Sequence, residues 1–403
     1  MNRKQGHKKR IGLVLAQVPG YSETFLRNKI KGLQTDGYEV VLFVGQSPSQ
    51  DPQLACEIHV SPFGYDSKIQ RFINGFISII KAVFLSPISS WRYFSLMRCD
   101  GVTLGRRFKN MVLNQFLMGH RLDWLHFGFG TMALHREQIA EAIGAQMGVS
   151  FRGFDLYLSP LTRPGCYDLL FKQKVYYHVL SQAMKENLHS LGIHKSMIAV
   201  IPPAINTSFF NQEPSKKEDY NPLSILTVAR LHWIKGLEYT LEALALLKQA
   251  GLSFRYSIVG EGDQYARLVW AVHQLGLKEE VTFLGKQNQE QIKEAYQTHQ
   301  VYLQYSIQEG FCNAVLEAQA MGLMCIVSDA DGLKENVLDG ETGWVVPKRQ
   351  PHLLTKQLLD VVHMPKDIHD RIRNQAVIRI QKEFYLKRQQ AAFVAFFNAK
   401  PVN

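Results

Sequence analysis

Two basic and two acidic residues in the second half of the chain have types and spacing that suit a phosphorylated ligand. Arg230 and Lys235 lie in the string ARLHWIKG. Glu309 and Glu317 stand eight residues apart in EGFCNAVLE. A helix that begins at Asn313 would offer the N–H groups of its first turn to an anion, and the two cations would neutralise the remaining charge of a diphosphate. This arrangement indicates a diphosphate site.

The two glutamates would lie on different sides of that diphosphate. Glu317 falls one turn into the helix, within reach of a ribose attached to the phosphates. Glu309 falls on the preceding loop, where a sugar or another leaving group would be. Either cation taken alone would more often be a solvated surface charge. Together with the two glutamates, Arg230 and Lys235 favour the ligand site.

The elements predicted around these residues alternate between strand and helix. In the first half, residues 10–16 and 39–44 have the composition of strands, with a helical spacing between them. After Asn221 the alternation restarts, with predicted strands at 224–228, 255–259, 281–284, 301–305 and 325–328 and predicted helices at 237–248, 265–275, 289–297 and 313–321. This rhythm predicts an α/β protein with two Rossmann-like, doubly wound parallel sheets. Ligands of such sheets bind at the carboxyl ends of strands, where the residues above and Gly260-Glu261-Gly262 fall.

The length of 403 residues is more than one hydrophobic core usually serves, so we expect two domains. Pro202, Pro203 and the polar segment 211–222 have the composition of a linker. The expected N-terminal domain therefore covers residues 1–205, and the expected C-terminal domain covers residues 206–385.

A longer motif carries a resemblance to a known family. The string EGFCNAVLEAQAMG, followed by Gly332, Glu335 and DGETGWVVP, resembles the signature of glycosyltransferase family 4, whose members are retaining enzymes of GT-B fold. The resemblance covers almost the full chain. It implies that the two Rossmann-like domains face each other across a cleft, and that residues 386–403 return as a helix to pack on the first domain.

The resemblance also implies roles for individual residues. Arg230 and Lys235 would act as catalytic cations on the diphosphate of a nucleotide-sugar donor, and Glu317 would bind the ribose. Glu309 would hold the transferred sugar as the third catalytic residue. Further donor contacts are implied for Gly20, Gly260, Glu261, Gly262, Phe311, Cys312 and Asn313, with the backbone N–H groups of Phe311 and Cys312 assisting Glu309.

The first domain contributes the implied acceptor side. The string PGYSETF resembles the first-strand loop of bacterial exopolysaccharide transferases of this family, in which Gly20 lets the backbone approach the phosphates and Tyr21 and Glu23 follow it. Many members carry His-Gly-x-Asp where this chain has Arg152-Gly153-Phe154-Asp155. Because arginine stays protonated, Arg152 cannot act as a base, and contact with an anionic sugar or an acceptor phosphate becomes the better role. His126 would line the same site, although a single histidine after a strand is more often structural.

The implied activity is retaining transfer of a hexose from a nucleotide diphosphate sugar, UDP-hexose being the usual donor, to a glycan acceptor. A lipid-linked acceptor in bacterial exopolysaccharide or cell-surface polysaccharide biosynthesis would fit. Two alternatives stay open: a nucleotide-sugar epimerase or synthase of the same fold, and a non-catalytic nucleotide-binding protein. A hydride-transfer enzyme fits poorly, because GEGDQY lacks the third glycine of a dinucleotide-binding turn.

No cofactor and no metal ion are expected. The string Asp329-Ala330-Asp331 matches a DxD motif, which in the other large glycosyltransferase fold would bind a metal with the nucleotide sugar. Here it follows the predicted strand 325–328 within the family 4 pattern, so we interpret it as a loop. The cations of the site would neutralise the diphosphate instead.

The charge of the chain is concentrated in its first half. Residues 1–205 hold 24 Lys and Arg against 13 Asp and Glu, whereas residues 206–403 hold 22 of each, so the whole net charge of +11 lies before residue 206. This asymmetry suggests a polyanionic partner, although a basic surface that only aids solubility is the competing interpretation. No stripe of alternating aromatic and basic residues favours nucleic acid, so the candidate partner is an anionic membrane surface.

Residues 69–84 have apolar side chains at helical spacing and precede Pro87, which predicts an amphipathic helix. Packing on the first sheet and lying on an anionic membrane are both open, and Lys81 argues against a membrane span.

The five cysteines include no CxxC pair, and the apolar run 11–16 is too short for a signal peptide. We therefore expect a cytoplasmic protein, peripheral on the inner face of the cytoplasmic membrane if the second interpretation holds.

Overall fold

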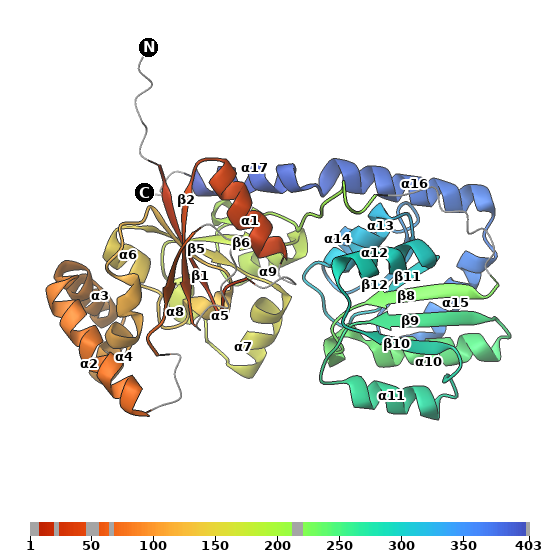
Figure 1. Ribbon diagram of the computed structural model, residues 1–403, viewed down its shortest axis with the longest axis horizontal. Helices are drawn as coiled ribbons and strands as arrows, with labels where there is room; N and C mark the ends of the chain where they lie inside the picture. Colours follow the sequence, from red (N-terminus) through yellow and green to blue (C-terminus); the bar gives the residue numbers. More distant parts are fainter. Residues whose placement is uncertain (1–7, 20–23, 46–55, 64–67, 212–220, 400–403) are drawn as a thin grey trace, which may run out of the picture. The chain divides into compact units, whose positions relative to one another are not determined.

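The computed structural model describes residues 8–19, 24–45, 56–63, 68–211 and 221–399. These residues form two compact α/β units (Figure 1). Unit 1 takes the described residues of 1–180, 185–201 and 390–403, and unit 2 takes residues 181–184 and the described residues of 202–389. The expected boundaries at 205 and 385 each fall four residues from these divisions.

Unit 1 is built on a seven-stranded sheet of order β3-β2-β1-β4-β5-β6-β7, and each neighbouring pair is parallel. Its strands read as nearly continuous apolar runs, as a parallel sheet covered on both faces requires. Their bounds are β1 Arg10–Leu15, β2 Glu39–Val44, β3 Glu57–Val60, β4 Trp124–Phe127, β5 Gln146–Ser150, β6 Val175–Val179 and β7 Ile198–Val200.

The helices of unit 1 include a group of three, α2, α3 and α4, inserted between β3 and β4. Among the described residues, its helical segments are α1 Thr24–Thr35, α2 Lys68–Phe84, α3 Pro87–Cys99, α4 Leu104–Asn114, η1 Gln115–Leu117, α5 Gly130–Ala133, α6 Ile139–Ile143, η2 Phe154–Leu158, α7 Ser159–Thr162, α8 Asp168–Phe171, α9 Gln182–Ser190, η3 Lys195–Met197 and α17 Leu386–Phe397. The first residues of α9 and of α17 belong to unit 2.

The core of unit 1 is completed by the far end of the sequence. Phe393, Phe396 and Phe397 of α17 are buried in the same cluster as the apolar residues of β1 and β2. The rings of Phe396 and Phe397 lie 5.5 and 5.3 Å from the ring of Trp124 in β4. Such aromatic contacts add to the free energy that burial of the rings already contributes. The part of α17 from residue 390 onward therefore completes the core of unit 1.

Unit 2 is built on a six-stranded parallel sheet of order β10-β9-β8-β11-β12-β13. Every strand and helix predicted after Asn221 is present within one residue of its predicted bounds. The elements are β8 Leu223–Val228, η4 Trp233–Lys235, α10 Leu237–Gln249, β9 Phe254–Val259, α11 Tyr265–Gln274, β10 Val281–Gly285, α12 Gln289–Thr298, β11 Val301–Gln304, α13 Asn313–Ala320, β12 Met324–Ser328, α14 Leu333–Asn336, β13 Trp344–Val346, α15 Pro351–Val362 and α16 Lys366–Glu383. The prediction of two parallel-sheet domains is confirmed.

In each sheet the strand order reverses once, between β1 and β4 in unit 1 and between β8 and β11 in unit 2. Ligands of doubly wound sheets bind outside the carboxyl ends of the strands at this reversal. In unit 2 the residues that follow β8 and β11 include Arg230, Lys235 and Glu309. No single helix among the described residues combines the length and apolar character that a membrane crossing requires.

Candidate active site

The loop that follows β8 carries Arg230 and Lys235, and a glycine turn after β9 holds it in place. The Leu231 N–H donates to the Glu261 carbonyl at 2.9 Å. A Cβ at Gly260, whose φ is +137°, would lie 1.9 Å from the Ala229 carbonyl oxygen, and a Cβ at Gly262 would lie 2.2 Å from that of Leu231. Only glycine allows this close backbone approach. The glycines therefore position the Arg230 loop, while their contact with a donor stays a prediction.

Lys235 and Glu309 are brought together from separate loops. The Lys235 Nζ forms an ion pair with Oε2 of Glu309, and both side chains are largely buried. Ser306 Oγ donates to the same carboxylate oxygen at 3.3 Å. Burial has the largest single effect and disfavours the ammonium group, but the charge of Glu309, its hydrogen bond and the nearby Cys312 together outweigh it, so the pKa of Lys235 is raised above its ordinary value. Lys235 thus carries a fixed positive charge in a site that solvent screens weakly.

Arg230 belongs to the same electrostatic cluster. Its side chain is exposed, yet its positive charge lies close enough to Lys235 to disfavour the ammonium form. This repulsion offsets part of the increase in the pKa of Lys235. Two cations held this near each other repel unless anionic groups accompany them, and in this structure the Glu309 carboxylate supplies one negative charge. The cluster therefore retains a net positive charge, which suits an anionic ligand.

Helix α13 starts beside this cluster at Asn313. Its capping residue, Cys312, has extended backbone angles and makes no side-chain capping hydrogen bond. The Asn336 side chain clamps Cys312 instead: its Oδ1 accepts from the Cys312 N–H at 2.9 Å, and its Nδ2 donates to the Cys312 carbonyl at 3.0 Å. Because the Cys312 N–H is engaged by Asn336, the expectation that it assists Glu309 is wrong. Phe311 and Asn313 stay predicted donor contacts.

Glu317 lies one turn along α13, and its carboxylate is part-buried. The Tyr296 hydroxyl donates to its Oε2 at 3.1 Å. Burial raises the pKa of Glu317 to about 7, and the hydrogen bond from Tyr296 only partly opposes that shift. A carboxylate at this place can accept hydrogen bonds from neighbouring hydroxyl groups of a ribose. Sequence reasoning missed Tyr296, Ser306 and Asn336. Their contacts with the site depend on how elements pack in three dimensions, which the spacing of residues along the chain does not show.

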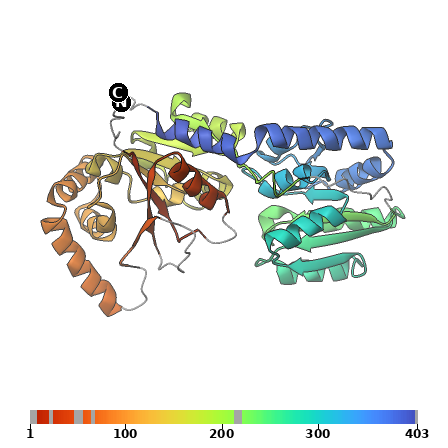
Figure 2. The same cartoon turned by 45° about the horizontal axis from the view of Figure 1, so that its top comes forward.

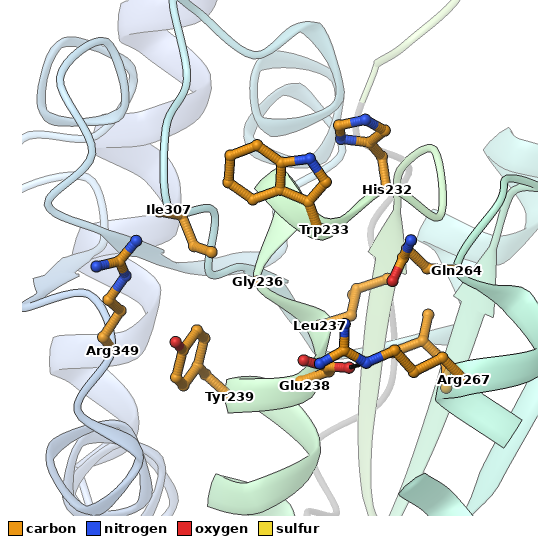
Figure 3. A pocket seen from close by; sticks show the side chains of 11 residues that line it. His232, Trp233, Gly236, Leu237, Glu238, Tyr239, Gln264, Arg267, Ile307 and Arg349 are labelled. Carbon is orange, nitrogen blue, oxygen red and sulfur yellow. Dashed lines mark ion pairs between the residues drawn. The ribbon is translucent and has the colours of Figure 1, made fainter. Parts of the chain in front are cut away.

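A cavity of about 330 Å³ lies on another side of the Arg230 loop (Figure 3). Trp233, Tyr239 and Arg349 surround it, and Arg267 forms an ion pair with Glu238 at its edge. None of the four residues predicted to bind the diphosphate, ribose and sugar lines this cavity. Its lining nevertheless includes Trp233, Gly236 and Ile307, which lie within two residues of Lys235 or Glu309 in the chain, and the sequence did not predict it.

Comparison with known proteins identifies the family of the chain. Residues 208–377 match the family model described as Glycosyl transferases group 1. An uncharacterized glycosyltransferase of Methanocaldococcus jannaschii is 31% identical over 316 residues, which are 72% of this chain and 77% of that protein. The chain belongs to the group 1 glycosyltransferases. The predicted family is thereby confirmed.

Two further likenesses extend over nearly the whole of this group 1 glycosyltransferase. The amylovoran biosynthesis glycosyltransferase AmsK of Erwinia amylovora is 27% identical over 376 residues, which are 87% of this chain and 90% of that protein. The crystal structure of Anabaena HepE in complex with UDP and glucose superposes with a TM-score of 0.70 at 15% identity, covering 96% of this chain and 99% of that one. Its likeness confirms the GT-B fold.

The predicted acceptor residues of the glycosyltransferase belong to unit 1. Tyr21 and Glu23, together with Gly20, which was predicted as a donor contact, lie outside the described residues. The guanidinium carbon of Arg152 lies 3.8 Å from the ring centroid of Phe25 and 5.3 Å from that of Phe129. Such stacking orients the planar cation. Its contact with an acceptor stays a prediction.

His126 and Asp155 are buried, and the prediction that they line an acceptor site is wrong. The ring of His126 is completely enclosed, with Nε2 at 2.8 Å from Ser150 Oγ and 3.1 Å from Lys29 Nζ. Asp155 accepts the N–H of Gly130 at 2.6 Å and that of Arg152 at 2.5 Å. Burial lowers the pKa of His126 well below its ordinary value and raises that of Asp155 to about 6. The structural interpretation of His126 is the correct one.

The two aspartates of the DxD string make hydrogen bonds inside unit 2. Asp329 Oδ1 accepts the Lys348 N–H at 2.9 Å, and Asp331 Oδ2 accepts from Gln308 Nε2 at 2.8 Å. These contacts fit the interpretation of the string as a loop.

Glu57, His59 and His120 of unit 1 are the one group in the described part of the chain that is close enough to hold a metal ion together.

Proposed function

We propose that this glycosyltransferase moves a hexose, with retention of anomeric configuration, from a UDP-sugar to a lipid-linked glycan during exopolysaccharide biosynthesis. The observation that carries the proposal is the Lys235–Glu309 ion pair beside the start of α13. The biosynthetic role is supported by the name of AmsK, an amylovoran biosynthesis glycosyltransferase, and the donor class by HepE, which was crystallised with UDP and glucose.

The charges of the site suit departure of a nucleoside diphosphate. As the bond between sugar and diphosphate breaks, negative charge grows on the phosphate oxygens. Arg230, Lys235 and the first-turn N–H groups of α13 would stabilise that charge from fixed positions, which lowers the barrier without reorganisation of solvent. The same cations would neutralise the diphosphate in the bound donor, so the proposal needs no metal ion.

Glu309 would have two partners in succession. Without donor it neutralises Lys235; once a diphosphate pairs with Lys235, the carboxylate becomes available to accept hydrogen bonds from hydroxyl groups of the sugar. Glu317 would hold the ribose. Family resemblance further implies that the acceptor hydroxyl attacks from the face of the leaving group and that a phosphate oxygen takes its proton, and we assign no side-chain nucleophile.

The test is release of UDP from a panel of UDP-sugars, measured with the full chain in the presence and absence of polyprenyl-linked glycan. We expect slow UDP release from one sugar alone, faster release with acceptor, and retention of configuration in the product by NMR. Conversion of one UDP-sugar into another without UDP release would indicate an epimerase. Binding of UDP without release from any sugar would indicate a non-catalytic protein.

A further inference from the structure

Helix α2 of unit 1 is turned so that its large apolar side chains face solvent. Phe72 and Phe84 are 80% and 76% exposed, whereas the residues that face the rest of unit 1 are small: Ser78 and Ala82 are 3% and 2% exposed. An amphipathic helix of a globular core has the opposite arrangement. Of the two interpretations left open for this helix, the one in which its apolar face packs on the first sheet is therefore wrong.

The exposed apolar surface continues past the end of α2. Leu85 and the α3 residues Ile88 and Trp91 are also more than two thirds exposed. Figures 1 and 2 show α2, α3 and α4 together beside the sheet, with α2 on the outer side of the group in both views. We call this surface the apolar ridge, and its most exposed members are Ile69, Phe72, Phe84, Leu85, Ile88 and Trp91.

The body of unit 1 does not seal the inner side of α2 either. A cavity of about 630 Å³ lies between α2, β3 and η1, lined by polar groups that include His59, Asn74, Lys81 and His120. The rest of unit 1 therefore buries little of the apolar surface of α2. Contiguous exposed apolar surface of this kind marks a site of contact with another molecule or with a membrane.

The charge around the ridge decides between these partners. Residues 67–122, which span α2, α3 and α4, contain nine Lys and Arg and a single acidic residue, Asp100. Arg71 and Arg92 are exposed next in sequence to Phe72 and Trp91 of the ridge, and Lys81, also exposed, lines the cavity on the inner side of α2. Two copies that met through this surface would bring like charges together. An anionic leaflet would neutralise them, and long basic side chains can reach its headgroups while apolar residues enter the acyl boundary.

We propose that the apolar ridge is a membrane-docking surface that lies in the interface of an anionic leaflet. It would keep unit 1 at the surface where the lipid-linked acceptor of the proposed function resides, and in that respect the inference rests on the proposed function. Binding to lipid does not itself require catalysis, so the two can be tested separately.

The experiment measures sedimentation of the full chain with vesicles of phosphatidylcholine alone or with about 30% phosphatidylglycerol, at about 0.1 M salt. The ridge variant is F72Q/F84Q/W91Q. The matched control is L161Q/W270Q/I378Q, whose side chains are 79%, 61% and 63% exposed outside the ridge. We expect the ridge variant to bind anionic vesicles at least about tenfold more weakly and the control to bind within about twofold of wild type, because only the ridge would insert.

A charge variant, R71Q/K81Q/R92Q, should weaken binding by at least about tenfold and reduce its salt dependence, since each basic residue near an anionic surface contributes about 1 kcal/mol. UDP release by both variants in detergent should equal that of wild type. If wild type releases no UDP from any UDP-sugar, the proposed function is wrong, but the result of the vesicle experiment is unaffected.

Three outcomes would overturn the docking proposal. Wild type fails to bind anionic vesicles; ridge and control variants bind alike; or the ridge variant changes only the oligomeric state measured by light scattering, which would make the ridge a protein interface. Circular dichroism checks that the variants fold. If the ridge variant does not, quenching of tryptophan fluorescence by brominated lipid, compared between wild type and Trp91→Phe, still decides whether Trp91 enters the bilayer.

Discussion

The structure brings two of the predicted site residues of unit 2 together, whereas it buries two of the predicted site residues of unit 1. In unit 2, Lys235 and Glu309 lie on loops beyond the ends of strands and form an ion pair. In unit 1, His126 lies in β4 and Asp155 in η2, the helical segment that follows β5, and both are buried. The unit 2 prediction combined a helix start, a strand end and two spaced glutamates, and each of these limits where the others can lie. The prediction for His126 used a single residue next to a predicted strand, with no second feature to fix its position. All four residues of β4 are buried, as in a parallel sheet that is covered on both faces, so a histidine in this strand is enclosed whichever face it points to.

The largest expected effect tests the unit 2 side of this comparison. Lys235→Ala should lower the rate of UDP release by about 10²- to 10³-fold, since it removes a fixed charge from the departing diphosphate. Lys248→Ala is the matched control, because Lys248 forms an exposed ion pair with Glu280 in the same unit. Steady-state kinetics measure both variants. Equal rates for the two would remove Lys235 from the active site.

The next effect tests the unit 1 side. His126→Ala should reduce the free energy of unfolding by about 2–3 kcal/mol, because it removes the buried hydrogen-bond partner of Lys29 and one of the two buried partners of Ser150. Urea denaturation measures the change, with the exposed His352→Ala as control. A variant with unchanged stability and strongly reduced transfer would restore His126 to the acceptor site.

The smallest expected effect concerns Glu317 and depends on pH. Its pKa is raised to about 7 in the folded protein, above the unfolded value of about 4.3. As pH rises between these values the unfolded chain gives up its proton first, so the buried carboxyl costs stability that grows with pH and levels off above about pH 7. Glu317→Gln cannot ionise and should therefore gain about 1–3 kcal/mol relative to wild type between about pH 4 and pH 8.

Urea denaturation at both ends of that range measures the difference for Glu317→Gln. The exposed Glu294→Gln on α12 serves as control for the loss of a carboxylate. A pH-independent difference for Glu317→Gln would mean that the carboxyl is solvated in the folded state.

Local pattern predicted the elements of unit 2 because each strand is short, apolar and followed by a helix of regular spacing. It could not predict the contacts between elements. Asn336 clamps Cys312 across 24 residues, and Tyr296 reaches Glu317 across 21. The same limit applied to α2, whose periodicity located the helix to within one residue but did not say which face would be buried. That depends on α3, α4 and β3, which spacing along α2 does not describe.

The position of α17 matters for how the protein is made. Unit 1 begins at the first described residues, yet the phenylalanines that surround Trp124 and His126 come after all of unit 2. During synthesis from the N-terminus, the six strands of unit 2 can pair as soon as residues up to about 389 have emerged, while unit 1 still lacks part of its core. The N-terminal unit is therefore the later one to mature. A ribosome that stops before residue 390 would release a chain whose second half is complete and whose first half exposes the surface that α17 should cover.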